Sequence, residues 1–369
     1  MISHSTYKKP VLLVGNGVRN ANASQLVYKF AKKTNIPVVT TMNAVDLAQD
    51  GIGFGFIGTY GNRIANMMIS ECDLLISIGA RLGLRQIGNK KELFAPKAKL
   101  IRVDIDQFEL NRKIKEEEED HLIDAKEFLE KLLADGADDY SDWKNKCFEI
   151  KEKIKNFDDQ IGNLVIKQIN SIIPENPIIA VDVGQNECWA AQSLELKGEN
   201  GRILIAGGYG SMGCALPFAV GASIASNNEK VFCITGDGGL QMNIQELETI
   251  VREHLPIKLI VLNNQSLGKI SEIQYKSYKE RYAQTTKDSG YSIPDFEKVA
   301  KAYGIESHTI QFEEGLDKYK EMFLSNSPCL INVLLPQNTL LTPKVQWETG
   351  SIVPELDKKL NNEIKELLK

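Results

Sequence analysis

The chain has 369 residues, which is enough for two or three domains that each bury a hydrophobic core. Its formal net charge is −5, so the sequence has no broad basic field that could hold nucleic acid or an anionic membrane. The longest apolar runs have only the length of strands, and the polar stretch Met1–Pro10 does not resemble a signal peptide. We therefore expect a cytoplasmic protein without nucleic-acid or membrane partners.

The first part of the chain alternates apolar segments of strand length with segments of helical periodicity. Such alternation predicts a parallel sheet with helices on both faces, which is a doubly wound α/β domain. We expect this domain to span residues 1–135. Its predicted strands are Val11–Val14, Pro37–Thr41, Leu74–Gly79 and Leu100–Asp106, and its predicted helices are Ala23–Lys33 and Arg63–Ser70.

Two charged segments lie towards the end of this domain and beyond it. The acidic run Lys115–Asp120 is predicted to be a solvated surface loop, because blocks of like charge repel one another and stay in water. Residues 136–160 should form a linker built around a polar helix at Asp139–Phe157.

A second alternating series occupies residues 161–340 and predicts another doubly wound parallel sheet. Residues 341–369 are predicted to be a polar tail that ends in a helix rich in lysine and glutamate. The predicted fold class is thus α/β, with two doubly wound parallel-sheet domains. The predicted strands of the second domain are Pro177–Val181, Arg202–Ala206, Lys230–Thr235, Ile257–Leu262 and Cys329–Leu334, and its clearest helix is Met212–Ser226.

The cysteines and histidines do not show the spacing of a disulfide framework or a metal site. The six cysteines lack a Cys-x-x-Cys pair, so we expect buried, reduced thiols, and the four histidines are far apart in the sequence. These residues are Cys72, Cys147, Cys188, Cys214, Cys233, Cys329, His4, His121, His254 and His308.

The stretch Gly236–Ser266 carries the strongest chemical signal. Asp237 follows an apolar strand inside a Gly-Asp-Gly turn, and Asn264 follows the next predicted strand. Because neighbouring strands of a parallel sheet end side by side, the carboxylate and the amide oxygen can converge. Oxygen ligands of this kind suit magnesium, which commonly binds few protein groups together with phosphates. The glycines would let the backbone approach a diphosphate at the start of the following helix.

Three motifs in this stretch resemble the acetolactate synthase large-subunit family, whose members use thiamine diphosphate. They are Gly236-Asp237-Gly238, Met242-Asn243-Ile244-Gln245-Glu246-Leu247 and Asn263-Asn264. The resemblance implies that Mg²⁺ takes the side chains of Asp237 and Asn264 and the backbone carbonyl of Ser266. It also implies that the cofactor is contacted by Gly184, Gln185, Asn186, Gly238, Gly239 and Gly268.

The glycine-rich stretch Gly207–Pro217 is similar to the family segment that bends the cofactor. By this resemblance Met212 is the apolar wedge between the two rings, and the Gly210 carbonyl accepts a hydrogen bond from the pyrimidine amino group. A glycine-rich loop before a core helix, with Met212 as ordinary packing, is the alternative.

The first domain resembles the middle domain of the family, which holds FAD in some members. The family's Arg-Phe-Asp-Asp-Arg is Arg81-Leu82-Gly83-Leu84-Arg85 here, so both aspartates are replaced. FAD binding and a purely structural domain therefore both stay open. Arg85 keeps the position of the arginine that grips the carboxylate of the second substrate, a task that suits a bidentate guanidinium. A solvated surface arginine is the alternative. The other matching segments are Gly15-Asn16-Gly17, Thr40-Thr41-Met42, Gly58-Thr59-Tyr60-Gly61, Gly79-Ala80-Arg81 and Asp104-Ile105-Asp106.

The sequence departs from the family beyond Asn264, where Lys269 and Ile273 replace a methionine and a tryptophan of the acceptor pocket. Lys269 would change the charge at the edge of the cofactor, and we expect it to be catalytic, together with Gly210, Met212 and Arg85. The resemblance implies decarboxylation of a 2-keto acid such as pyruvate and carboligation to an acceptor. A simple 2-keto acid decarboxylase, a carboligase for surface-polysaccharide synthesis and a noncatalytic assembly module of the same fold are alternatives.

The family's activating glutamate lies on a pyrimidine-binding domain N-terminal to the two domains that this chain resembles. We therefore expect a fragment or a split chain, which alone is inactive. The pyrimidine-binding domain would lie on a missing segment or on a separate polypeptide. The resemblance also implies a homodimer or homotetramer.

Overall fold

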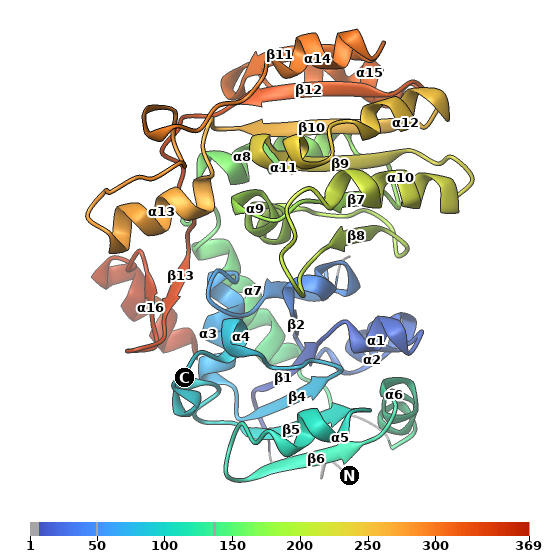
Figure 1. Cartoon of the computed structure of the whole chain (residues 1–369). Coiled ribbons are helices and arrows are strands. Elements are labelled where there is room, and N and C mark those ends of the chain that lie inside the picture. The colour runs from blue at the N-terminus through green and yellow to red at the C-terminus, as the bar shows by residue number, and fades with distance from the viewer. Residues whose placement is uncertain (1–6, 49–50, 136–137, 369) are drawn as a thin grey trace. The chain divides into compact units, whose positions relative to one another are not determined.

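A computed structural model describes residues 7–48, 51–135 and 138–368 of the chain (Figure 1). The chain forms two compact units. The first runs to Asp158 and resumes at Thr342, and the second is Asp159–Leu341. Each unit contains a six-stranded parallel sheet, which confirms the α/β fold. Within the described ranges, no helix has the length and apolar character that crossing a membrane requires.

The sheet of the first unit has the strand order β3-β2-β1-β4-β5-β6. Alternate residues of a strand point to opposite faces of its sheet. Val11 and Leu13 accordingly enter the core on one face of β1, and Leu12 and Val14 enter the core on the other face. The strands are β1 (Pro10–Val14), β2 (Val38–Thr40), β3 (Gly53–Phe56), β4 (Leu74–Ile78), β5 (Lys99–Asp104) and β6 (Glu118–Leu122).

Helices cover both faces of this sheet, as a doubly wound fold requires. Helices α3 and α7 contribute to the core on one face, and α2 and α6 contribute to the core on the other face. The helices are α1 (Gly17–Asn20), α2 (Ser24–Thr34), α3 (Arg63–Glu71), α4 (Leu84–Ile87), α5 (Gln107–Asn111), α6 (Ala125–Ala134) and α7 (Ser141–Lys153), with 3-10 turns η1 (Met42–Leu47) and η2 (Lys91–Leu93).

The prediction of a solvated acidic loop at residues 115–120 is wrong. Residues from Glu118 onward form β6, which pairs with β5 at the edge of the sheet. The Glu118 side chain is fully buried, and its Oε1 lies 2.9 Å from Nη1 of Arg102, whose side chain is only 3% exposed. Oε2 of Glu118 accepts from the backbone N–H groups of Ile114 and Lys115. An ion pair across two strands, which sequence spacing cannot reveal, therefore holds this acidic residue inside.

Replacing Glu118 by alanine should lower the free energy of unfolding by about 3 kcal/mol, because it removes the carboxylate that is hydrogen-bonded to the buried Arg102 and leaves only the more distant Asp120, at 3.9 Å. Urea unfolding followed by tryptophan fluorescence measures the change. Glu117→Ala is the matched control, since Glu117 is exposed one position earlier. Equal losses in the two variants would contradict a structural role for the ion pair.

The segments expected as a linker helix and a polar tail both pack on the first unit. Trp143, Cys147 and Ile150 of α7 are buried in its core, as are Ile364 and Leu368 of the last helix. Helix α7 is therefore more than part of a linker, because its apolar face completes one side of the first sheet. Residues 136 and 137 of the expected linker lie outside the described residues. The tail consists of β13 (Lys344–Gln346), β14 (Ser351–Val353) and α16 (Lys358–Leu368), and β13 and β14 pair antiparallel.

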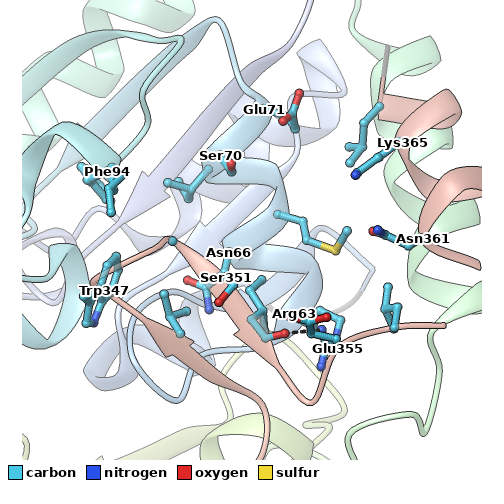
Figure 2. Close-up of a pocket in the computed structure, with 18 of the residues that line it drawn as sticks. Arg63, Asn66, Ser70, Glu71, Phe94, Trp347, Ser351, Glu355, Asn361 and Lys365 are labelled. Atoms are coloured by element: carbon cyan, nitrogen blue, oxygen red, sulfur yellow. Dashed lines mark hydrogen bonds between the residues drawn. The ribbon is translucent and has the colours of Figure 1, made fainter. Parts of the chain in front are cut away.

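Buried Arg63 anchors the tail to the first unit. Its guanidinium donates to both carboxylate oxygens of Asp158, at 2.9 and 2.6 Å, and to the carbonyl of Pro354 at 2.6 Å. Figure 2 shows Arg63 below a cavity of about 430 Å³, with Trp347 and Phe94 on one side and Asn361 and Lys365 on the other. The guanidinium therefore forms its hydrogen bonds within the chain and joins Asp158 to the tail.

The sheet of the second unit has the order β11-β12-β10-β9-β7-β8 (Figure 1). The chain passes from β7 outward to β8 and then returns to the other side of β7 with β9, so the strand order reverses between β7 and β9. Ligands of open α/β sheets bind beyond the strand ends at such a reversal. The strands are β7 (Ile178–Val181), β8 (Arg202–Ile205), β9 (Val231–Gly236), β10 (Ile257–Asn263), β11 (Glu306–Gln311) and β12 (Cys329–Leu334).

Helices also lie on both faces of the second sheet. Val231 and Cys233 of β9 belong to the core with α10, α12 and α14, whereas Phe232 stacks on Phe323 of α15 at a ring distance of 6.2 Å. The helices are α8 (Ile161–Ile172), α9 (Gln185–Ser193), α10 (Ala215–Ala225), α11 (Asp237–Met242), α12 (Glu246–Arg252), α13 (Gly268–Ser277), α14 (Phe296–Ala302) and α15 (Lys320–Leu324), with 3-10 turns η3 (Lys287–Ser289), η4 (Phe312–Glu314) and η5 (Asp317–Tyr319).

Candidate functional site

Asp237 lies at the point where β9 ends and α11 begins, and it is only 2% exposed. Its Oδ1 atom accepts hydrogen bonds from the N–H of Gly238 at 2.6 Å and from the hydroxyl of Tyr291 at 2.9 Å. Its Oδ2 atom is buried and has no hydrogen-bond partner among the described residues. Buried polar atoms without partners are rare and costly, so Oδ2 is a position that calls for a ligand.

Burial raises the pKa of Asp237 from its ordinary value of 3.8 to about 6. Removal from water disfavours the charged carboxylate, and this effect outweighs the hydrogen bonds from Tyr291 and from nearby backbone N–H groups. A cation next to Oδ2 would supply the charge that the surrounding protein does not.

Asn264 and Ser266 follow the end of the neighbouring strand β10, and both are buried. The register pairs Leu262 of β10 with Gly236 of β9, so the Asn264 loop and the Asp237 turn leave the sheet at adjacent positions. The Oδ1 atom of Asn264 accepts from the N–H of Ser266 at 3.2 Å. Backbone groups of Gln265 and Ser266 also lie close enough to Asp237 to oppose the rise of its pKa. The structure thus brings together the three residues predicted from the sequence to hold a metal.

A second group of buried side chains supports Asn264. Its Nδ2 donates to the hydroxyl of Thr339 at 2.8 Å, and this hydroxyl donates to Oε1 of Gln185 at 2.6 Å. Gly268 lies against the same group, since a Cβ atom there would lie 2.2 Å from Oε1 of Gln185 and 2.6 Å from Nδ2 of Asn264. A side chain at this position would displace the amide ends of Gln185 and Asn264, so glycine leaves their hydrogen bonds intact.

Asp182, at the end of β7, joins three segments of the site. Its Oδ2 atom accepts from the N–H of Gly213 at 3.0 Å and from the Thr235 hydroxyl at 3.2 Å, and its carbonyl accepts from Nδ2 of Asn186 at 2.6 Å. A Cβ on Gly239 would lie 1.7 Å from Oδ2 of Asp182. The last glycine of the Gly-Asp-Gly-Gly turn, Gly239, is therefore required by this close approach as well as by any ligand.

The glycine-rich loop reaches the same turn. A Cβ built on Gly238 would lie 3.3 Å from Cε of Met212, so the methionine side chain faces the Gly-Asp-Gly turn. Met212 is 40% exposed, which is unusual for a residue that serves only as core packing. Gly210 has a φ of +63°, a conformation that glycine adopts without strain. Gly184, before α9, has a φ of +130°.

The residues present fit a magnesium ion with a diphosphate. The described residues contain no group of three or more His, Cys, Asp or Glu side chains arranged to hold a metal. The predicted set contains one carboxylate, with the other oxygens from an amide and a backbone carbonyl, and such hard oxygen ligands are typical of Mg²⁺ bound together with phosphates. The unpartnered Oδ2 of Asp237 is the observation that favours a cation here.

Two predicted catalytic residues stay predictions. Lys269 lies half-buried in the first turn of α13, in the same unit as Asp237. Arg85 is exposed in α4 of the first unit.

FAD is not supported. A Cβ on Gly15 would lie 2.1 Å from the carbonyl oxygen of Gly79, and one on Gly17 would lie 2.7 Å from Cα of Gly79. The glycines of Gly15-Asn16-Gly17 are therefore explained by the contact of two backbone segments, without a nucleotide.

Two family descriptions match parts of this chain. Residues 182–333 match the family described as "Thiamine pyrophosphate enzyme, C-terminal TPP binding domain", and residues 5–132 match "Thiamine pyrophosphate enzyme, central domain". The first matched segment lies in the unit that holds Asp237, and the second lies in the other unit. The chain belongs to the thiamine pyrophosphate enzymes.

Several relatives among these enzymes are large subunits of acetolactate synthase. The chain is 35% identical to "Acetolactate synthase isozyme 2 large subunit" of Escherichia coli (strain K12), over 92% of this chain and 62% of the relative. It is 34% identical to "Probable acetolactate synthase large subunit" of Methanocaldococcus jannaschii, over 89% of this chain and 58% of the relative. It is 32% identical to "Acetolactate synthase large subunit" of Porphyra purpurea, over 94% of this chain and 60% of the relative. The chain thus spans about three-fifths of the length of these relatives.

Sequence reasoning missed three residues of this site. Asp182 could have been found, because it follows a predicted strand and precedes Gly184 by two positions. Tyr291 and Thr339 gave no signal, because they reach the site from loops 54 and 75 residues beyond their partners Asp237 and Asn264.

Proposed function

We propose that this chain is the cofactor-binding part of a thiamine diphosphate- and magnesium-dependent enzyme of the acetolactate synthase type. Such an enzyme decarboxylates a 2-keto acid such as pyruvate and joins the remaining fragment to an acceptor. The observation that carries the proposal is the buried, unpartnered Oδ2 of Asp237 beside Asn264 and Ser266. The relatives named as acetolactate synthase large subunits support the choice of reaction.

Each proposed role is assigned to a residue of the second unit. Asp237, Asn264 and the carbonyl of Ser266 would hold Mg²⁺, and Gly238 and Gly239 leave room for a diphosphate because they lack side chains. Bound thiamine diphosphate supplies the nucleophilic carbon and the electron sink for decarboxylation. Met212 would maintain the bent shape of the cofactor, and Gly210 would accept from its amino group. Gly184, Gln185, Asn186 and Gly268 would line the diphosphate end.

Further parts of this proposal concern what lies around the chain. A pyrimidine-binding domain, on a longer form of the protein or on a separate polypeptide, would supply the activating glutamate. The assembly would be a homodimer or homotetramer in the cytoplasm. In such an assembly Arg85 would contact the carboxylate of the second substrate.

The direct test is calorimetric titration of thiamine diphosphate into the chain, with Mg²⁺ and again after chelation by EDTA. We expect binding that requires the metal, because the diphosphate would bind partly through it. Absence of binding in the presence of Mg²⁺ would exclude the proposed cofactor site.

The completed enzyme should discriminate poorly between acceptor substrates. Lys269 and Ile273 lie on the first two turns of α13, and Ile273 is 43% exposed, so no flat aromatic face is offered here. We expect the completed enzyme to use 2-ketobutyrate and pyruvate as acceptors to within about tenfold of each other. One methylene in an apolar pocket is worth about 1–3 kcal/mol, and without an aromatic face only the lower end of that range is expected. Competition of the two acceptors, with both products quantified, measures the ratio. A strong preference for 2-ketobutyrate, or no change in the ratio in Ile273→Trp, would count against this assignment of α13.

A further inference from the structure

One loop contacts two of the three proposed cation ligands. We call residues 284–291 the clasp. At its end, the Tyr291 hydroxyl donates to Oδ1 of Asp237 at 2.9 Å. Near its beginning, the carbonyl of Thr285 accepts from the hydroxyl of Ser266 at 2.8 Å, and from the N–H of Leu267 at 2.9 Å. The clasp therefore forms an outer layer of the site, built from a segment that follows α13.

The clasp is held in one conformation by its own hydrogen bonds. The Ser289 hydroxyl accepts from the N–H groups of Thr285 and Thr286, at 3.1 and 2.9 Å. The N–H of Tyr291 donates to the carbonyl of Thr286 at 3.0 Å. Thr285 and Thr286 are both buried, and Thr286 forms a β-bridge with Ser266. Tyr291 is therefore presented to Asp237 by a folded loop.

The contact with Tyr291 makes the two oxygens of Asp237 unequal. Oδ1 receives two donors, the Tyr291 hydroxyl and the Gly238 N–H, whereas the buried Oδ2 receives none among the described residues. A cation can then be bound through Oδ2 alone. Single-oxygen ligation suits Mg²⁺, which takes six ligands in a regular octahedron, whereas Ca²⁺ takes six to eight ligands and readily accepts both oxygens of one carboxylate.

We propose that Tyr291 is a positioning residue of the metal site, which holds Oδ1 of Asp237 so that only Oδ2 meets the cation, and that this arrangement favours Mg²⁺ over Ca²⁺. The inference rests on the proposed function, because it takes Asp237 as a cation ligand.

Tyr291→Phe removes the donor and keeps the ring. In calorimetric titrations of Mg²⁺ into the chain with thiamine diphosphate, the variant should bind Mg²⁺ at least about tenfold more weakly, the usual lower limit for the loss of an outer-layer partner. Titration with Ca²⁺ should show a smaller loss, so the ratio of the two affinities should fall. Tyr319→Phe is the matched control, since Tyr319 lies in the same unit and contacts His308 instead.

Hydrogen exchange of the wild-type chain gives a readout that does not depend on the variant's folding. Mg²⁺ with thiamine diphosphate should slow amide exchange in residues 284–291, and Asp237→Asn should abolish that slowing. Unchanged exchange of the clasp, or unchanged Mg²⁺ affinity in folded Tyr291→Phe, would overturn the role of Tyr291 and leave the proposed function standing. A wild-type chain that binds no Mg²⁺ would overturn both.

Discussion

Asp237→Ala should abolish the magnesium-dependent binding of thiamine diphosphate, and Asn264→Ala should weaken it strongly. Asp237 is the only carboxylate in the proposed ligand set, and its Oδ2 atom is buried without a protein partner among the described residues. Removal of the carboxylate leaves two neutral oxygens, which hold a divalent cation poorly. Calorimetric titration of the cofactor with Mg²⁺ measures the loss. Glu253→Gln is a suitable control, because it removes one negative charge at an exposed position.

Asp237→Asn separates the charge of this residue from its shape. Because burial raises the pKa of Asp237 to about 6, the metal-free fold favours the neutral carboxyl group more than the unfolded chain does. That contribution to stability is complete below the ordinary value of 3.8 and is lost as the pH rises through about 6. Without metal, the variant should therefore become more stable relative to the wild type as the pH rises from 4 to 8, because the wild-type carboxyl group loses its proton at a pH of about 6.

With Mg²⁺ and thiamine diphosphate at pH 8, the wild type should instead be more stable than Asp237→Asn. Thermal unfolding of both proteins under the two conditions tests this. Unchanged cofactor affinity in both Asp237→Ala and Asn264→Ala would remove the basis of the metal assignment.

The 369-residue chain alone, supplied with Mg²⁺ and thiamine diphosphate, should form acetolactate and CO₂ from pyruvate at or near the background rate. The family resemblance assigns the carboxylate that activates the cofactor to a pyrimidine-binding domain, and such acid–base help contributes about a hundred- to ten-thousandfold. Tyr209, Met212 and Met242 are exposed near the proposed cofactor site, as expected of a surface that another domain would cover. The chain should therefore also self-associate.

Both outcomes can be measured on one preparation. Product formation is followed with and without the cofactor, beside a full-length acetolactate synthase as the assay control, and light scattering reports the assembly. Robust cofactor-dependent turnover would show that the activating group lies within these residues. Buried Glu272, whose Oε2 accepts from Gln185 at 3.2 Å, would then be the first candidate to replace.

Local features of the sequence were sufficient for much of the fold and for the centre of the site. Apolar runs such as Val231–Ile234 and Ile257–Leu262 have the length and composition of buried strands, and they form β9 and β10. The ends of adjacent parallel strands meet whatever the rest of the chain does, so the convergence of Asp237 and Asn264 could be predicted. The glycines and Met212 could be identified because they resemble a known motif.

Sequence patterns failed to predict the structure where charged or polar residues form strands or are buried. Strand β6 is charged and β11 is polar, so neither has the apolar pattern of a buried strand. Each lies at an edge of its sheet, where charged and polar side chains are common. Glu118 is buried because it pairs with Arg102 and accepts from the backbone N–H groups of Ile114 and Lys115. The tail belongs to the first unit because Ile364 and Leu368 are buried in the core of that unit and Arg63 donates to the carbonyl of Pro354, 291 residues away in the sequence.

The sequence by itself therefore determined the α/β class, most of the strands and the Asp237–Asn264 pair, because each depends on a short segment or on neighbouring strand ends. Only the tertiary structure decided the surroundings of that pair. Tyr291 and Thr339 reach it from two separate loops, and their hydrogen bonds depend on how those loops fold over the strand ends. A donor that arrives from a distant loop leaves no periodicity and no fixed spacing in the sequence, since its position is set by the packing of everything in between.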